Sequence, residues 1–205
     1  MRIFIVFVTT ILTLGLLATD AFAAEGGGTT PTFKMSGDVA LLSHYVEYGL
    51  SQSDKTPALQ GSFWFNLGSQ FRLGLWGSNT NYEHSDDHFN LRFSGDIRVD
   101  FTQNNNMVIA YSRSQYYNGG DRNGDLIGVR FNFTDYRVTY DYMSNWEGTK
   151  KSSNRFGFGK LTKVFTTWEW DNEAGYNAPG ASGINPYFDL RTALGTKWEI
   201  GRAHV

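Results

Sequence analysis

Residues 89–101 read FNLRFSGDIRVDF and alternate strictly between two kinds of residue. The odd positions are apolar or glycine, namely Phe89, Leu91, Phe93, Gly95, Ile97, Val99 and Phe101. The even positions are polar, and four of them are the charged residues Arg92, Asp96, Arg98 and Asp100. A period of two places successive side chains on opposite faces of a strand, and no helix produces it. This stretch therefore predicts a β-strand with one apolar and one charged face.

The same alternation recurs along the chain. We predict strands near residues 35–48, 59–67, 71–75, 89–101, 107–111, 127–133, 136–142, 154–158, 164–170 and 190–198. Long polar connections (51–56, 80–87, 118–125, 147–153, 172–186) alternate with short ones (68–70, 102–106, 134–135, 160–162). Two unlike ends are typical of an outer-membrane barrel. The predicted fold class is all-β: a closed antiparallel up-and-down transmembrane β-barrel of about ten strands, with both termini on the periplasmic side.

Hairpin parity supports these strands. A two-residue turn after Phe133 pairs it with Tyr136, so the apolar faces of both strands coincide. A three-residue turn after Leu67 pairs it with Phe71 in the same way. We therefore expect one continuous apolar face across the sheet.

Alternation alone does not say which face points inward. A soluble, secreted, lipocalin-like binding barrel would fill its interior with the apolar face, whereas an outer-membrane barrel turns that face to lipid. Mixed charges on the polar face and aromatic residues at strand ends favour the membrane. We predict as lumen-lining Arg72, Arg92, Asp96, Arg98, Asp100, Arg130, Arg137 and Asp141. We predict as lipid-facing or oligomer-forming Phe89, Leu91, Phe93, Ile97, Val99 and Phe101.

Composition excludes several classes of protein. The 205 residues contain no cysteine, which rules out disulfide scaffolds, thiolate metal sites and thiol catalysis. A net charge of −2 shows no basic excess for nucleic acid. The mean hydropathy of −0.37 excludes a helical membrane protein but not a barrel, whose wall alternates.

The two ends of the chain read as additions to this domain. Residues 1–23 have the features of a signal peptide, with Arg2, an apolar run and a cleavage site after Ala23. Residues 24–33 then form a flexible leader, and residues 34–199 form the barrel. The final IGRAHV is what the codons ATC GGA AGA GCA CAC GTC of a sequencing adapter encode. We therefore expect residues 200–205 to be an artefact and native sequence to stop near Glu199.

Three short motifs resemble the TorF-type porin family of Gram-negative outer membranes, whose pattern is roughly S-D-Y-x-x-R-G-x-S-Q, P-A-x-Q-G and G-x-W-x-S-N. The matching positions are Ser43, Tyr45, Gly49, Ser51, Gln52, Pro57, Gln60, Gly61, Trp76, Ser78 and Asn79. His44 replaces the usual Asp, and Tyr48 replaces the usual Arg. The match covers the first strands specifically and the rest only by strand layout.

The resemblance implies a small porin-like barrel in the outer membrane of a Gram-negative bacterium, inserted by the barrel-assembly machinery. In the lipid-trapping branch of this superfamily it also implies homo-oligomeric rings that hold lipid. Eight strands leave an interior that side chains just fill, and open channels need 16 to 18. Our leading hypothesis is a non-enzymatic barrel that organises lipid or has a structural role. The alternative is a narrow solute or ion channel.

Three local patterns contain residues of the types found in metal or catalytic sites. Residues 83–88 (EHSDDH) could chelate a divalent cation, and residues 119–125 (GGDRNGD) are similar to a calcium loop without its distal glutamate. His44 could pair with Ser43 or Ser51, although no acid partner is evident. Solvated loops and turn chemistry explain these patterns more simply. We therefore assign no catalytic residue, no metal and no cofactor, and we expect no nucleic acid partner.

Overall fold

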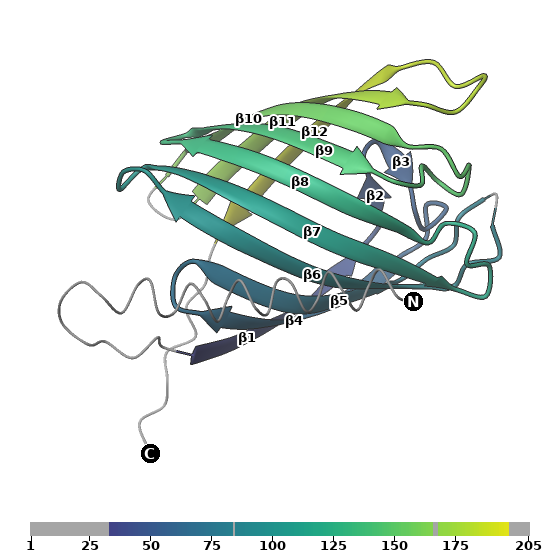
Figure 1. Ribbon diagram of the computed structural model, residues 1–205, viewed down its shortest axis with the longest axis horizontal. Helices are drawn as coiled ribbons and strands as arrows, with labels where there is room; N and C mark the ends of the chain where they lie inside the picture. Colours follow the sequence, from purple (N-terminus) through teal and green to yellow (C-terminus); the bar gives the residue numbers. More distant parts are fainter. Residues whose placement is uncertain (1–32, 84, 166–167, 197–205) are drawn as a thin grey trace. The chain divides into compact units, whose positions relative to one another are not determined.

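The computed structural model describes residues 33–83, 85–165 and 168–196 as strands joined by turns and loops (Figure 1). The strands are β1 (Phe33–Leu42), β2 (Val46–Glu47), β3 (Leu50–Ser51), β4 (Ala58–Leu67), β5 (Phe71–Asn79), β6 (Phe89–Asp100), β7 (Asn105–Tyr117), β8 (Gly124–Phe133), β9 (Tyr136–Met143), β10 (Ser153–Lys163), β11 (Trp168–Pro179) and β12 (Tyr187–Thr196). Ten form one antiparallel sheet, and β2 pairs only with β3. The predictions of an all-β fold and about ten strands are confirmed. Among the described residues, no helix is long and apolar enough to cross a membrane.

The ten-stranded sheet is an up-and-down meander in which each strand pairs with the next strand of the sheet, so that β1 pairs with β4. Its order is β1-β4-β5-β6-β7-β8-β9-β10-β11-β12. Within the described residues, β1 and β12 are its two edges and do not pair with each other, so the predicted closed barrel is not seen. That prediction used a last strand reaching Trp198, whereas β12 is described only to Thr196. The predicted signal peptide, residues 24–32 of the predicted leader, and residues 197–205 also lie outside the described residues.

The predicted hairpin registers are confirmed. Phe133 pairs with Tyr136 across the turn between β8 and β9. Leu67 pairs with Phe71 across the turn between β4 and β5. The apolar faces of neighbouring strands therefore coincide, as the pleat requires.

Several predicted boundaries are wrong. The predicted short connection at residues 160–162 lies inside β10, which continues to Lys163, and β11 begins at Trp168 rather than near residue 164. The first strand ends at Leu42 rather than Tyr48, because the chain bends away from the sheet at residues 43–44. Tyr48 and Gly49, with φ angles of 50° and 79°, form the turn between β2 and β3. The predicted loop at residues 172–186 is mostly strand, since β11 continues to Pro179. In residues 172–179, polar and apolar positions still alternate, but the segment is so polar overall that it resembles a loop.

The two ends of the sheet carry connections of different length. Because neighbouring strands are antiparallel, successive connections lie at opposite ends. The short turns at residues 68–70, 101–104 and 134–135 lie at one end of the sheet, as do the last residue of β10 and the first residue of β11, and we call this the short-turn end. The connections at residues 43–57, 80–88, 118–123, 144–152 and 180–186 occupy the long-loop end. The predicted alternation is confirmed, and β1 begins and β12 ends at the short-turn end.

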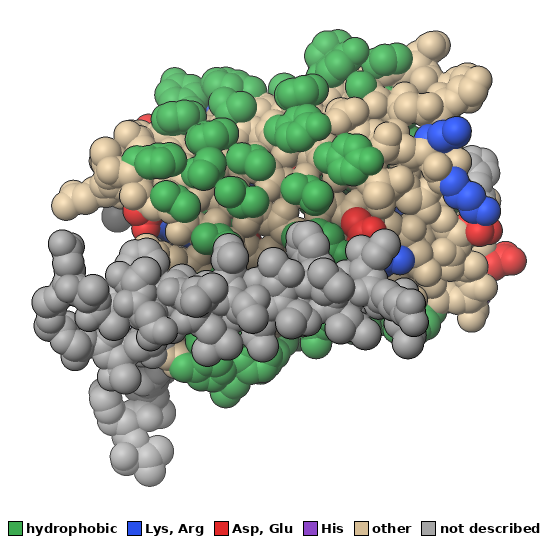
Figure 2. Space-filling view, in the orientation of Figure 1, with side chains coloured by type: hydrophobic (Ala, Val, Ile, Leu, Met, Phe, Trp, Pro, Cys, Tyr) green, Lys and Arg blue, Asp and Glu red, His purple; other side chains and the backbone are tan. Residues whose placement is uncertain are grey.

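The sheet curls so that its apolar face is convex and its charged face is concave. Apolar side chains cover much of the visible convex face in Figure 2. Phe93 is 44% exposed and Ile97 is 43% exposed. By contrast, Gln52, Asn90 and Asn177 are fully buried. Within the described residues, the burial pattern of a water-soluble domain is thus inverted.

Candidate functional site

Residues 43–56, which we call the inner segment, fold against the concave face at the long-loop end. The hairpin of β2 and β3 forms the middle of this segment. It is closed at its base, where Gln52 N donates to Tyr45 O at 2.8 Å. The hydroxyl of Tyr187 on β12 donates to Tyr48 O at 3.0 Å. The hairpin tip therefore contacts the last strand of the sheet.

Glu47 fixes the hairpin to the opposite part of the sheet. Its Oε1 lies 2.8 Å from Arg92 Nη2 on β6, and its Oε2 accepts from the Tyr45 hydroxyl at 2.7 Å. The Tyr45 ring meets the Trp76 ring edge-on, with centroids 5.7 Å apart. Arg92 Cζ lies 5.0 Å from the same Trp76 ring. Glu47 thus joins the inner segment to β6, and the Tyr45 ring joins it to β5.

Arg122, in the loop before β8, holds the base of the inner segment. Its Nη2 donates to Gln52 Oε1 and to Glu147 Oε2, and its Nε donates to Glu147 Oε2 at 3.0 Å. Its guanidinium lies between the rings of Tyr82 and Tyr116, at 4.0 and 4.3 Å from their centroids. The Arg122 side chain is only 2% exposed. We call Arg122, Gln52, Glu147, Tyr82 and Tyr116 the arginine clamp.

Burial affects the pKa values of the two charged groups of the arginine clamp, Glu147 and Arg122. Burial raises the pKa of the Glu147 carboxyl above its ordinary value, although Arg122 opposes this shift. Burial disfavours the charge of Arg122, but Glu147 outweighs it, so the pKa of Arg122 is also raised. The guanidinium therefore stays charged, and Glu147 depends on it to remain an ion.

The two loops with possible metal ligands, residues 83–88 and 119–125, meet at Asp87. Its Oδ1 accepts from the backbone N–H groups of Gly119 and Gly120 at 3.1 and 3.2 Å. Its Oδ2 lies 3.8 Å from Arg122 Nη1. Among the described residues, which omit His84, no group of three His, Asp or Glu side chains could hold a metal ion. Asp87 is therefore a structural link between the loops.

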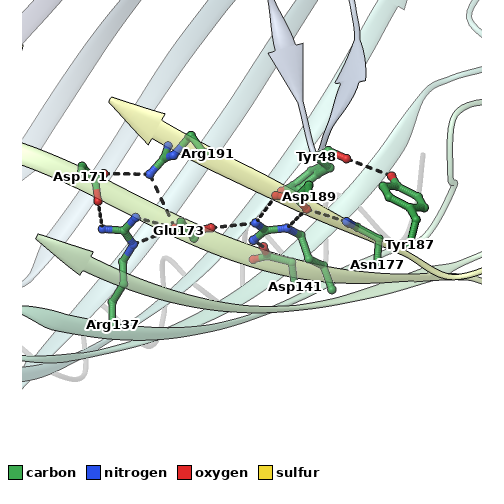
Figure 3. A network of polar contacts seen from close by, with 10 residues as sticks. Tyr48, Arg137, Asp141, Asp171, Glu173, Asn177, Tyr187, Asp189 and Arg191 are labelled. Carbon is green, nitrogen blue, oxygen red and sulfur yellow. Dashed lines mark hydrogen bonds and ion pairs between the residues drawn. The ribbon is translucent and has the colours of Figure 1, made fainter. Parts of the chain in front are cut away.

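A second charged cluster, which we call the charged ladder, lies on the concave face of β9 to β12 (Figure 3). Its members are Arg137, Asp141, Arg155, Asp171, Glu173, Asp189 and Arg191. At its centre, Arg155 Nη2 lies 2.8 Å from Glu173 Oε1 and 3.1 Å from Asp189 Oδ1. Arg155 Nη1 is 3.8 Å from Asp141, and Arg155 Cζ is 5.2 Å from the Tyr48 ring. The ladder thus reaches the inner segment.

The rest of the ladder extends toward the short-turn end. Arg137 lies 2.6 Å from Asp171 and 2.7 Å from Glu173, counting the nearest nitrogen and oxygen. Arg191 lies 3.0 Å from Asp171. Because β9 and β11 both flank β10, the Arg137 side chain has to cross β10 to reach Glu173. The carboxylates of Asp171 and Glu173 on β11 therefore pair with arginines on other strands.

Glycines on the concave face leave room for these crossings. A Cβ at Gly175 would lie 2.4 Å from Arg155 Nη2, and a Cβ at Gly159 would lie 2.6 Å from Arg137 Cζ. Real Cβ atoms do not approach other heavy atoms this closely, so a larger residue would displace an arginine. The glycines are therefore part of the ladder.

The remaining lumen-lining predictions fall on the concave face of β5, β6 and β8. Arg72 Nη2 lies 2.6 Å from Asp96, and Arg72 Cζ lies 4.2 Å from the Trp64 ring. Arg98 Nε lies 2.6 Å from Asp100 near the short-turn end, where both side chains are exposed. Arg130 also belongs to this face, because its neighbours on β8, Val129 and Phe131, lie on the convex face.

The residues predicted to face lipid belong to the convex face. Phe93, Ile97 and Val99 are exposed, while Leu91 is half-buried. The Phe89 ring contacts the ring of Tyr117 on β7, with centroids 6.0 Å apart. Phe101 follows the end of β6 and is 58% exposed.

Most motif residues behind the porin resemblance gather around the inner segment. Ser43, Tyr45, Gly49, Ser51 and Gln52 belong to it, and Trp76 contacts Tyr45. Pro57, Gln60 and Gly61 begin or precede β4, and Ser78 and Asn79 end the neighbouring β5. The Asn79 side chain binds Leu59 N and Pro57 O, at 2.7 and 3.2 Å. A Cβ at Gly49 would lie 3.0 Å from Asp189 Cβ.

The structure brings His44 and Ser51 together, with His44 Nε2 2.7 Å from Ser51 Oγ. The hairpin of β2 and β3 causes this approach by returning the chain to His44. Among the described residues, no carboxylate binds the other ring nitrogen of His44. Ser43 takes no part in the pair. The two side chains therefore stabilise the hairpin.

Sequence reasoning missed the arginine clamp and the centre of the charged ladder. It did not single out Arg122, Glu147, Arg155 or Glu173 as interior residues. For Arg155, the inward glycines at Gly157 and Gly159 were a readable signal, because they alternate with two outward phenylalanines. For Arg122 there was none, since it lies in a loop without periodicity.

Little free space remains beneath the inner segment. A cavity of about 50 Å³ lies between Glu47, Arg92, Tyr116, Arg122 and Glu147. This volume suits a few water molecules. The long-loop end of the concave face is therefore filled by the chain itself.

Comparison with known proteins identifies one family. A family profile described as "Bacterial protein of unknown function (Gcw_chp)" matches residues 25–159, more than half of the chain. No curated protein and no solved structure matches. The resemblance to TorF-type porins therefore stays a prediction.

Proposed function

The chain belongs to the Gcw_chp family of bacterial proteins of unknown function, and we propose that it is an outer-membrane β-barrel that acts through its apolar outer surface. One observation carries the proposal: exposed apolar side chains cover the convex face while charged and polar side chains fill the concave face. In water such a surface would drive aggregation, whereas in lipid it is the stable arrangement. A lipocalin-like protein would need the apolar face inside.

In the membrane, the proposed barrel closes by pairing β1 with β12. Unpaired backbone N–H and C=O groups are too costly in hydrocarbon for two edges to stay open. Both edges are ten residues long. Aligning them end to end sets the concave Ser36 opposite the concave Ala193 and the convex Val39 opposite Leu190. Val39 and Leu190 are 79% and 77% exposed, far more than their counterparts on paired strands.

The proposed barrel has no free diffusion pore and no enzymatic role. The inner segment, the arginine clamp and the charged ladder occupy the concave face. A lipid-organising or structural role then falls to the outer surface, with homo-oligomers that retain phospholipid. The second candidate, a narrow ion channel, is favoured by the exposed charges of Arg98 and Asp100 at the short-turn end.

The test is to express the full chain in a Gram-negative host and fractionate the membranes. We expect the protein in the outer membrane, resistant to carbonate extraction, and migrating faster on gels before heating than after. Native mass in mild detergent is expected to show a discrete multiple with bound phospholipid. A soluble, detergent-independent monomer would contradict the proposal.

Planar-bilayer conductance separates the two candidates. The lipid-organising barrel is expected to give no stable current steps. Reproducible unitary steps from the wild-type protein would favour the narrow channel instead.

A further inference from the structure

A polar row interrupts the apolar side chains of the convex face near the short-turn end. Lys160 on β10 pairs in register with Asn172 on β11, which pairs with Thr192 on β12. By strand alternation these positions share the face of Phe158, Ala174 and Leu190, the apolar row one step closer to the long-loop end. We call Lys160, Asn172 and Thr192 the polar row.

The hydrogen bonds of the polar row leave two donor groups, on Asn172 and Lys160, without a partner among the described residues. Trp170 Nε1 donates to Thr192 Oγ1 at 2.7 Å, and Thr192 Oγ1 donates to Asn172 Oδ1 at 2.8 Å. These bonds use the hydroxyl hydrogen of Thr192 and the amide oxygen of Asn172. Among the described residues, no acceptor binds Asn172 Nδ2 and no carboxylate pairs with Lys160. The row therefore presents an amide NH₂ and an ammonium group to the outside.

The position of the row matches the headgroup level of a membrane. Lys160 lies three residues before the end of β10, which is roughly 10 Å along the strand. The exposed rings of Trp170 and Tyr136 flank the row, and Lys160 Nζ lies 5.2 Å from the Tyr136 centroid. Tryptophan and tyrosine belts mark this level in barrels, and a lysine there can extend its amine to the interface.

We propose that Lys160, Asn172 and Thr192, with Trp170 beside them, bind the phosphodiester of one glycerophospholipid in the leaflet at the short-turn end. The phosphate oxygens accept from Lys160 Nζ and Asn172 Nδ2, and the acyl chains lie along Phe158 and Leu190. An anionic acceptor satisfies both free donors at once, which water-free hydrocarbon does not. This site rests on the proposed membrane location and identifies the lipid that the outer surface holds.

The test uses the full chain purified in mild detergent and titrated with phosphatidylglycerol, with bound lipid counted by native mass. We expect one tightly bound lipid per protomer. Lys160→Gln is expected to raise the half-saturating lipid concentration about fivefold. Asn172→Asp places a negative charge beside the phosphate and is expected to weaken binding further. The matched control is Lys163→Gln, on the same strand but on the concave face, and it is expected to bind like wild type.

Three outcomes would overturn the site. Lys160→Gln could bind as wild type, Lys163→Gln could weaken binding equally, or millimolar inorganic phosphate could displace the lipid, which would make free phosphate the ligand. These failures are distinct from failure of the proposed function. If the wild-type protein reaches the outer membrane but the Lys160→Gln variant binds lipid equally well, only the site is contradicted. If the wild-type protein never enters the membrane, both the site and the proposed function are contradicted.

Discussion

Close approaches at single residues hold the concave face together. Trp64 lies flat over Gly74, where a Cβ would come within 2.2 Å of the indole Cε3. Arg72 Cζ lies 4.2 Å from the centroid of the same ring. The indole is rigid, so the whole ring has to shift to admit a larger side chain at Gly74.

The first prediction compares two glycines. Gly74→Ala is expected to lower the free energy of unfolding by about 1–3 kcal/mol, because the added methyl overpacks against Trp64. Urea unfolding of protein folded in lipid vesicles measures the change. Gly195→Ala is the matched control, since no atom lies within 4 Å of its Cβ position. Equal effects at both sites would show that the Trp64 contact is unimportant.

The second prediction concerns the buried charge of Arg122. Arg122→Met keeps much of the stem between the two tyrosine rings but leaves Glu147 and Asp87 without their cation. Removing one partner of a buried ion pair typically costs about 3–5 kcal/mol. The double variant Arg122→Met/Glu147→Gln is expected to recover part of this loss. Strictly additive losses in the same unfolding assay would contradict coupling within the clamp.

At the scale of the strand, neighbouring residues place their side chains on opposite faces of the sheet. Phe93 and Ser94 are neighbours on β6, and their side chains point to opposite faces of the sheet. Phe93 pairs in register with Leu75, and Ser94 pairs with Gly74. The same substitution at the two positions therefore tests which face meets lipid.

The third prediction follows from this pair. In lipid vesicles, Phe93→Arg is expected to lower the free energy of unfolding by roughly 2–4 kcal/mol, because it places a charge in hydrocarbon. Ser94→Arg is expected to cost less, since the concave face already holds Arg72, Arg92 and their partners. If Ser94→Arg proves the more damaging change, the convex face does not meet lipid.

At the scale of the molecule, the inner segment lies against the concave face at the long-loop end. Its hairpin bridges β6 through Glu47 and β12 through Tyr48. Its base is already closed by the bond between Gln52 N and Tyr45 O. Two glycines could therefore replace residues 46–51 and join Tyr45 to Gln52 as a two-residue turn.

The fourth prediction is that this replacement opens a conducting path. Planar bilayers containing the shortened variant are expected to show unitary current steps that the wild-type protein lacks. Deleting residues 182–183 from the exposed loop after β11 is the control and is expected to leave the bilayer silent. If the shortened variant is silent too, side chains of the strands close the interior without the hairpin.

The fifth prediction concerns closure, and it exploits the absence of cysteine from the chain. With Ser36→Cys on β1, a second cysteine at Ala193 or Gly195 on β12 is expected to form an intramolecular disulfide in the membrane. A cysteine at Leu194, on the convex face, is expected not to, because only residues on the same face bring their Cβ atoms close enough. Disulfide-linked dimers instead of the intramolecular product would mean that edges pair between copies.

The sequence by itself determined the all-β class, which residues share a face of each strand, and the two unlike ends. Residues 89–101 were sufficient to separate the apolar face from the charged one, because a period of two is a local property of an extended backbone. Hairpin registers were equally readable, since short turns fix them within a few residues. These features depend on neighbours in sequence.

Only the tertiary structure decided where the inner segment lies and which charges meet. Residues 43–48 read as more strand, yet the chain bends at residues 43–44 and then reverses at Tyr48 and Gly49, which form the turn between β2 and β3. Arg122 and Gln52 are 70 residues apart in sequence. Their contact exists only because the curled sheet brings one loop over another segment, and side-chain pairing at such a separation leaves no periodic trace in the sequence.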